Sequence, residues 1–278
     1  MTVLERPDGA HIWWTSVGAG EPVVLVMGLG YPSDMWFRVS PVLAQRYRVL
    51  LLDNRGAGRT GDVPGAPYSV ETMAGDVLAV LDAAAEASAH VIGASMGGLI
   101  AQEVALSAPE RVRSLVLACT HPGVAHSTWD PAAVALLSRR GGQTPRQAAE
   151  ASIPFNYADG TPRERIEQDW AVRLPLASSA AGYLAQAQGT AKWSGLERLA
   201  SLRAPTLVVH GADDRLVPAV NGRRIAQEVP GAELEIIADA NHLFFTDQPE
   251  RTNAVLLAWL DRHRSPAPSS QGVPSDPP

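Results

Sequence analysis

The chain has 278 residues, 46% of them hydrophobic, and 29 acidic against 23 basic side chains give it a net charge of −6. This hydrophobic share is enough for a buried core, so the composition excludes disorder for most of the chain. The acidic balance argues against nucleic acid or an anionic membrane as a partner, because both call for a basic face. Cys119 is the only cysteine, which excludes an intrachain disulfide and a zinc site built on thiolates.

The start of the chain has no basic stretch followed by an apolar run, so we expect no signal peptide. No apolar run approaches the roughly 20 residues that a membrane helix needs. We therefore expect a cytoplasmic protein.

Apolar runs and turn residues predict that strands and helices alternate over the first 120 residues. Continuous apolar runs, such as residues 23–27, are typical of strands buried on both faces of a sheet. The predicted strands are 2–6, 11–17, 23–27, 48–53, 90–94 and 113–118, and the predicted helices are 33–46, 70–85 and 96–107. This alternation predicts right-handed crossovers and a mostly parallel sheet.

The alternation stops between about residues 121 and 196, where Pro and Gly separate helical stretches and no strand-like run occurs. The predicted helices there are 131–140, 145–152, 162–172 and 176–188. Strands then resume at 206–210 and 233–238, with helices at 218–229 and 248–263. We predict an α/β core interrupted by a helical insertion, followed by a disordered Pro/Ser-rich tail at 265–278.

A G-x-G-x-x-G pattern at 56–61 follows a predicted strand but does not indicate a dinucleotide site. That fingerprint requires the third glycine to open a helix whose N-terminus binds the pyrophosphate. Here Val63-Pro64-Gly65-Ala66-Pro67 follows, and prolines at this spacing cannot form that helix. We interpret the segment as a loop.

The segment Gly93-Ala94-Ser95-Met96-Gly97 has the form G-x-S-x-G and joins a predicted strand to a predicted helix. At such a turn the serine adopts a strained backbone that raises its hydroxyl above the sheet, and its neighbours two positions away must be small. The helix N-terminus also aims N–H groups that can stabilise an oxyanion. A glycine-rich turn that only packs closely is the alternative, but the strand–helix context favours a nucleophile at Ser95.

A serine hydroxyl needs a histidine to take its proton and an acid to orient that histidine. Asp214 and His242 each follow a predicted parallel strand, so both belong at the same sheet edge as Ser95. The order Ser95, Asp214, His242 is the one that accompanies a serine at such a strand–helix turn, which is called the elbow. Asp213 is the alternative acid, and the G-x-x-D spacing from Gly211 favours Asp214.

Together these segments resemble the α/β-hydrolases that carry a helical cap, over about residues 11–264. The elbow, the G-x-x-D-x-x-x-P segment at 211–218 and the Asn241-His242 loop carry the resemblance jointly. Residues 53–60 also resemble the family's D-x-R-G-x-G-x-S turn, with Thr60 in place of serine.

The resemblance implies the α/β-hydrolase fold, with a mostly parallel eight-stranded sheet flanked by helices and a helical cap inserted after the sixth strand. The core would comprise 1–121 and 197–264, and the cap 122–196. The family places its oxyanion donors at the backbone N–H groups that correspond here to Leu29 and Met96. Met27 stands where the family often has a histidine, which removes a polar side chain that braces this loop.

We therefore expect a serine hydrolase that cleaves an ester or lactone of a small, largely apolar substrate, of the bacterial esterase and enol-lactonase type. No metal or organic cofactor is implied. Trp129, Tyr157 and Tyr183 are predicted to line an apolar pocket beneath the cap, because the insertion is rich in aromatic residues.

Several alternatives remain open at this point. A thioesterase, a C–C bond hydrolase or a cofactor-free haloperoxidase-like enzyme would use the same three residues, and a non-hydrolytic cyclase or ligand receptor would use the pocket alone. The serine at the elbow excludes haloalkane dehalogenases and epoxide hydrolases, which carry a carboxylate there. The remaining candidate side chains are interpreted as turn, core, surface or pocket-lining groups: Asp239, Cys119, His11, His90, His121, His126 and His263.

Overall fold

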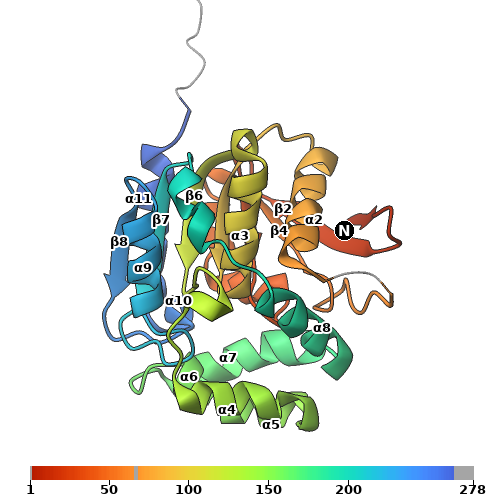
Figure 1. Cartoon of the computed structure of the whole chain (residues 1–278), viewed down its shortest axis with the longest axis vertical. Helices are drawn as coiled ribbons and strands as arrows, with labels where there is room; N and C mark the ends of the chain where they lie inside the picture. The colour runs from red at the N-terminus through yellow and green to blue at the C-terminus, as the bar shows by residue number, and fades with distance from the viewer. Residues whose placement is uncertain (1, 66–67, 266–278) are drawn as a thin grey trace, which may run out of the picture.

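The computed structural model describes residues 2–65 and 68–265, and its centre is an eight-stranded sheet in the order β1-β2-β4-β3-β5-β6-β7-β8 (Figure 1). The strands from β4 to β8 run parallel, and β2 pairs antiparallel with both β1 and β4. The strands are β1 (Thr2–Glu5), β2 (His11–Val17), β3 (Glu21–Val26), β4 (Tyr47–Leu52), β5 (Ala89–Ala94), β6 (Val112–Ala118), β7 (Thr206–Gly211) and β8 (Glu233–Ile237).

Side chains of the central strands alternate between two buried clusters, one on each face of the sheet. In β3, Val24 and Val26 belong to one cluster, whereas Val23 and Leu25 belong to the other. Because both faces are covered, the strand is apolar at successive positions, as the sequence predicted. The elements that flank the sheet are η1 (Ser33–Arg38), α1 (Ser40–Leu43), α2 (Val70–Ala83), α3 (Met96–Ser107), η2 (Pro109–Arg111), η6 (Leu196–Ser201), α9 (Val220–Glu228), α10 (Phe244–Asp247) and α11 (Pro249–Arg262).

The segment between β6 and η6, here called the insertion (residues 122–196), gathers its helices beyond one end of the sheet (Figure 1). Its two ends meet, because Gly123 and Ser194 form an isolated bridge and the Gly195 N–H donates to the Pro122 carbonyl at 3.0 Å. Its elements are η3 (Val124–His126), α4 (Pro131–Arg139), η4 (Arg140–Gly142), α5 (Pro145–Ala151), α6 (Ile153–Asn156), α7 (Arg163–Arg173), η5 (Leu174–Leu176) and α8 (Ala180–Ala191).

The structure corrects one predicted helix. Residues 33–46 do not form a single helix but the 3-10 segment η1 followed by the short α1. Ser33 is tied by its N–H and its hydroxyl to the Asp53 carboxylate, both at 2.7 Å, which fixes the entry of the segment. Pro41 lacks an N–H and therefore starts a new helix instead of continuing one.

The predicted tail at 265–278 lies outside the described residues, except for Ser265. No helix among residues 2–65 and 68–265 is both long and apolar enough to cross a bilayer.

Candidate active site

Ser95 stands between β5 and α3 in a backbone conformation that L-residues rarely adopt, with φ 55° and ψ −119°. The glycines around it are required by close packing. A Cβ on Gly93 would lie 2.1 Å from the Gly97 carbonyl oxygen, and a Cβ on Gly97 would lie 2.2 Å from the Val26 carbonyl oxygen. The G-x-S-x-G spacing thus has the steric cause that the sequence suggested, and strain of this kind concentrates at functional sites.

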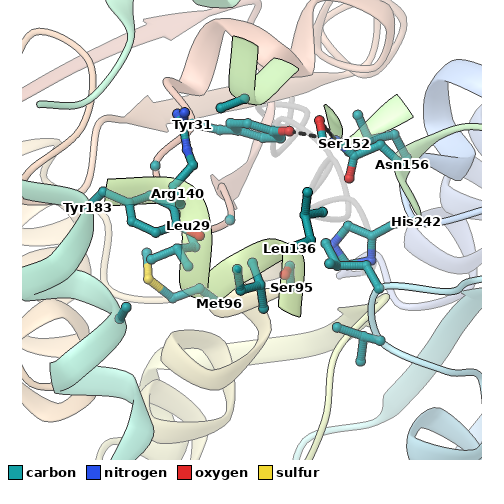
Figure 2. Close-up of a pocket in the computed structure, with 18 of the residues that line it drawn as sticks. Leu29, Tyr31, Ser95, Met96, Leu136, Arg140, Ser152, Asn156, Tyr183 and His242 are labelled. Carbon is teal, nitrogen blue, oxygen red and sulfur yellow. Dashed lines mark hydrogen bonds between the residues drawn. The ribbon is translucent and has the colours of Figure 1, made fainter. Parts of the chain in front are cut away.

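The structure brings Asp214 and His242 together, with 2.9 Å between the Asp214 Oδ2 and the His242 Nδ1. Asp214 follows β7, His242 follows β8, and both side chains are buried. Figure 2 shows His242 and Ser95 among the residues around one cavity. A carboxylate that holds Nδ1–H leaves Nε2 as the basic nitrogen, so this pair can accept a proton from a hydroxyl in the cavity.

A second histidine, which the sequence did not single out, also contacts Asp214. The His210 Nε2 lies 2.7 Å from the Val217 carbonyl oxygen and 3.3 Å from Asp214 Oδ2. Since a carbonyl only accepts, Nε2 carries the proton and faces both oxygens. The Gly222 position in α9 is close enough that a Cβ there would lie 2.4 Å from the His210 ring, so only glycine fits beside it.

The pKa of Asp214 lies below its usual range. Burial alone would raise this pKa, but the charge of His242 and hydrogen bonds from His210 and His242 outweigh burial. The second carboxylate oxygen also accepts the backbone N–H groups of Leu216 and Val217, at 3.0 and 2.8 Å. Asp214 is therefore held as an ionised acceptor.

Asn241 joins the loop of Asp214 to the loop of His242. The sequence did not predict this role. Its side-chain oxygen accepts the N–H groups of Arg215 and His242, at 3.0 and 2.9 Å. Its amide nitrogen donates to the carbonyls of Pro154 and Tyr157 in the insertion. One side chain thus fixes the loops of Asp214 and His242 against the insertion.

The predicted oxyanion donors, Leu29 and Met96, both line the cavity with Ser95. Met96 is the first residue of α3, where a backbone N–H has no intrahelical partner. Within the described part of the chain, neither the Leu29 nor the Met96 N–H donates to a protein acceptor. Both groups are therefore available to a ligand oxygen.

The loop that carries Leu29 is braced by side chains other than the family's usual histidine. The Gly30 N–H donates to the Gln186 Oε1 at 2.7 Å, and the Gln186 amide donates in turn to the Arg55 carbonyl. The Asn54 amide donates to the Met27 carbonyl at 2.9 Å. Gln186 lies in α8, about 150 residues away in sequence, and no local motif identifies it.

A cavity of about 500 Å³ lies between the sheet edge and the insertion, a size typical of small-molecule sites. Of the three predicted pocket residues, Trp129 and Tyr183 line it, and Tyr183 packs against Gly30. Tyr157 does not line it. Its ring is buried in the core cluster that contains Trp170, because α6 ends at Asn156 and turns the next side chain inward.

Two other candidates also reach the cavity. His121 lines it and stacks edge-on to Trp129 at 4.9 Å, and burial lowers its pKa to about 4, so it is neutral near pH 7. Cys119 lines it as well, and burial raises the pKa of its thiol well above the usual value. A thiol that stays protonated is a weak nucleophile and an imidazole with a lowered pKa is a weak base, so both side chains are interpreted as wall residues.

No group of three His, Cys, Asp or Glu side chains that could hold a metal occurs within residues 2–65 and 68–265. Neither Asp213, Asp239 nor His126 lines the cavity. His126 instead pairs with Glu197 at 3.2 Å on the surface of the insertion.

A sequence profile of the alpha/beta hydrolase fold matches residues 21–249. The chain belongs to the alpha/beta hydrolase fold family. This confirms the resemblance and the fold class that the sequence predicted.

Three relatives of this family illustrate the similarity. A protein provisionally named carbamate hydrolase RutD, from Azorhizobium caulinodans, is 33% identical over 262 residues, which cover 90% of this chain and 95% of that protein. A thermophilic esterase from Thermogutta terrifontis has a TM-score of 0.82 and 27% identity, covering 95% of this chain and 98% of the esterase. Est816, an N-acyl homoserine lactone degrading enzyme, has a TM-score of 0.80 and 29% identity, and the match covers 93% of this chain and 100% of the Est816 chain. Family and relatives together support hydrolase activity.

Proposed function

We propose that the chain is a serine hydrolase that cleaves a carboxylic ester or lactone through an acyl-enzyme on Ser95. The observation that carries the proposal is the 2.9 Å contact between Asp214 and His242 at the cavity that the strained Ser95 faces. A hydrogen-bonded acid–histidine pair beside a cavity is suited to accept a proton from a group in that cavity. The esterase and the lactone-degrading enzyme among the relatives support the same substrate class.

In the proposed reaction the Ser95 oxygen attacks the carbonyl carbon while the His242 Nε2 accepts the hydroxyl proton. Asp214 holds the imidazole tautomer and stabilises its positive charge. The N–H groups of Leu29 and Met96 donate to the oxyanion. His242 then gives the proton to the leaving alkoxide, and water, activated by the same histidine, hydrolyses the acyl-enzyme and restores Ser95.

The insertion would act in this proposal as a cap domain over a core of 1–121 and 197–264. Its residues supply most of the wall opposite Ser95, including Leu136 and Tyr183 (Figure 2). Substrate selection would therefore reside in the insertion, and the chemistry in the core.

The experiment is turnover of a panel of 4-nitrophenyl esters, lactones and one carbamate by the wild type beside Ser95→Ala. We expect hydrolysis of at least one ester or lactone by the wild type and none by the variant. Hydrolysis that persists in Ser95→Ala, or a folded wild type that turns over only the carbamate, would contradict the proposal.

A further inference from the structure

The described lining of the cavity carries two positively charged side chains and no negatively charged one. Arg140 and Arg173 both line the cavity, and its lining contains no Asp or Glu among the described residues. This contrasts with the whole chain, whose net charge is −6. A mostly apolar cavity strengthens the field of any charge on its wall, because little water screens it.

Arg173, the last residue of α7, is buried with only 5% of its surface exposed. Its Nη1 donates to the Tyr31 hydroxyl, whereas its Nε and Nη2 have no hydrogen-bond acceptor in the described part of the chain. No carboxylate of those residues lies within 4 Å of its guanidinium. The guanidinium also lies 4.8 Å from the centre of the Tyr31 ring, but no carboxylate pairs with it in the described part of the chain. A buried cation without a carboxylate is costly to a fold, so its presence calls for a compensating negative charge.

The carboxylate that influences Arg173 from farther away is already engaged. Asp169 forms an ion pair with Arg38 at 3.2 Å, and its other oxygen accepts the Thr246 hydroxyl at 2.8 Å. One carboxylate thus faces two guanidinium groups. Among the described residues Arg173 therefore has no carboxylate to itself.

The Tyr31 hydroxyl lies between the Arg173 guanidinium and the cavity. It accepts from the Arg173 Nη1 and from the Asn156 Nδ2, the latter at 2.9 Å. These two donors occupy both lone pairs of the phenol oxygen, so its own proton is left to donate. Figure 2 shows Tyr31 with Ser152 and Asn156 across the cavity from Ser95 and Met96.

The same cluster is connected to both halves of the catalytic site. Tyr31 follows the oxyanion donor Leu29 by two residues, and the Asn156 carbonyl accepts the N–H of Leu243, the neighbour of His242, at 2.8 Å. A ligand held by Tyr31 is therefore fixed in position relative to the nucleophile and the base. Such positioning raises the rate of the step at the other end of the ligand.

We propose that Tyr31 and Arg173 form an anion-binding end of the cavity, and that the substrates are esters or lactones that also carry a free carboxylate. The inference rests on the proposed function, of which it names the substrate class. The Tyr31 O–H donates to one carboxylate oxygen, and the Arg173 guanidinium behind it neutralises the charge. A neutral alkyl chain at the same place would leave the guanidinium without a carboxylate.

The experiment compares kcat/KM for anionic and neutral esters that are matched in length, with a carboxylate oxygen counted in place of the terminal methyl group. The 4-nitrophenyl monoesters of adipate, pimelate and suberate are set beside the heptanoate, octanoate and nonanoate. A second pair, 4-acetoxybenzoate and 4-methylphenyl acetate, places the charge on the leaving group. We expect the wild type to favour the anionic member of at least one pair by about 10- to 100-fold, the range of a charge-assisted hydrogen bond.

Variants test whether this preference depends on the two residues. Arg173→Gln and Tyr31→Phe are expected to lose at least about tenfold of the preference, and Arg173→Lys, which keeps the charge, to retain part of it. Arg163→Gln is the matched control, because Arg163 lies on the exposed surface of α7 and pairs with Glu167. A preference below twofold in the wild type for every pair, or one that survives both Arg173→Gln and Tyr31→Phe, overturns the proposal. If Arg173→Gln does not fold, Tyr31→Phe and Arg173→Lys carry the test.

Binding separates failure of this inference from failure of the proposed function. Calorimetric titration with suberate needs no reactive serine and is made on the wild type, Ser95→Ala and Arg173→Gln. If no ester is turned over, suberate binding that weakens tenfold in Arg173→Gln still supports the anion site. Absent binding, or equal binding by the wild type and Arg173→Gln, contradicts it.

Discussion

The sheet edge that carries Ser95, Asp214 and His242 and the cavity wall that the insertion places over it differ in how their polar groups are paired. At the edge, both Asp214 oxygens and all polar atoms of the Asn241 side chain have partners within the protein. On the wall, Arg173 keeps two nitrogens without an acceptor in the described part of the chain. The hydrogen bonds of Asp214 and Asn241 are thus in place before a substrate arrives, as transition-state stabilisation by preorganised groups requires. On the wall, Arg173 gains a carboxylate partner only when a ligand brings one.

The largest effect is expected from breaking the edge at its acid. Asp214→Asn keeps the shape but removes the charge that holds the His242 tautomer. We expect kcat to fall by about 10⁴, as for such a change in other Ser-His-Asp sites. The measurement is kcat for the best ester at pH 7. A fall of less than tenfold would show that Asp214 does not orient the base.

The steric basis of the elbow predicts a loss of stability. In Gly97→Ala the new Cβ would lie 2.2 Å from the Val26 carbonyl oxygen, a backbone atom that cannot move alone. We expect the free energy of unfolding to fall by about 3 kcal/mol. Urea denaturation measures it, with Gly160→Ala as the control, because nothing lies within 4 Å of a Cβ there. Equal stabilities of the two variants would refute the close-packing argument.

The brace between the edge and the insertion predicts a smaller, coupled effect. Gln186→Leu keeps the volume but leaves the Gly30 N–H and the Arg55 carbonyl without their Gln186 contacts. We expect kcat to fall about tenfold because the neighbouring Leu29 donor shifts, a cost of about 1.4 kcal/mol. Steady-state kinetics of Gln186→Leu beside the exposed Gln45→Leu tests this. An unchanged kcat in Gln186→Leu would mean that the loop holds its shape without the brace.

The smallest effect concerns pH and a histidine far from the chemistry. Burial lowers the pKa of His90 to about 4, and its Nδ1 contacts the Ser114 hydroxyl at 2.8 Å. Between about pH 6.5 and 4 the unfolded chain binds a proton at this side chain that the folded chain does not, so stability falls as the pH falls. From pH 7 to 5.5 the loss due to His90 is about 1 kcal/mol. Urea denaturation at both values should show a correspondingly weaker pH dependence in His90→Gln, and an equal dependence would contradict it.

The sequence predicted that Ser95, Asp214 and His242 lie at one edge of the sheet, because the signals for this edge are local. Each signal lies within a few residues and reflects a physical requirement of the fold. These signals are the apolar run at 23–27, the glycines around Ser95 and the spacing from Gly211 to Asp214. Because parallel strands end at the same sheet edge, residues that follow different strands are brought together there. This is why the structure finds Asp214 and His242 in contact although 28 residues separate them.

The wall could not be predicted, because its contacts join segments far apart in the sequence. Arg173 and Tyr31 are separated by 142 residues, and Gln186 and Gly30 by 156. Tyr157 shows the same difficulty, because the direction of its side chain could not be predicted. Aromatic composition placed it in the pocket, whereas the end of α6 turns it into the core. Side-chain direction in short helices depends on packing that a single sequence does not state.

The central claim is that Ser95 is an activated nucleophile, and intact mass after treatment with a fluorophosphonate tests it most directly. We expect one adduct on the wild type and none on Ser95→Ala or His242→Ala, because only a serine with a working base attacks phosphorus readily. Arg173→Gln should still be labelled, since it changes the wall and not the edge. A folded wild type without an adduct, or an adduct that persists in Ser95→Ala, would contradict the account.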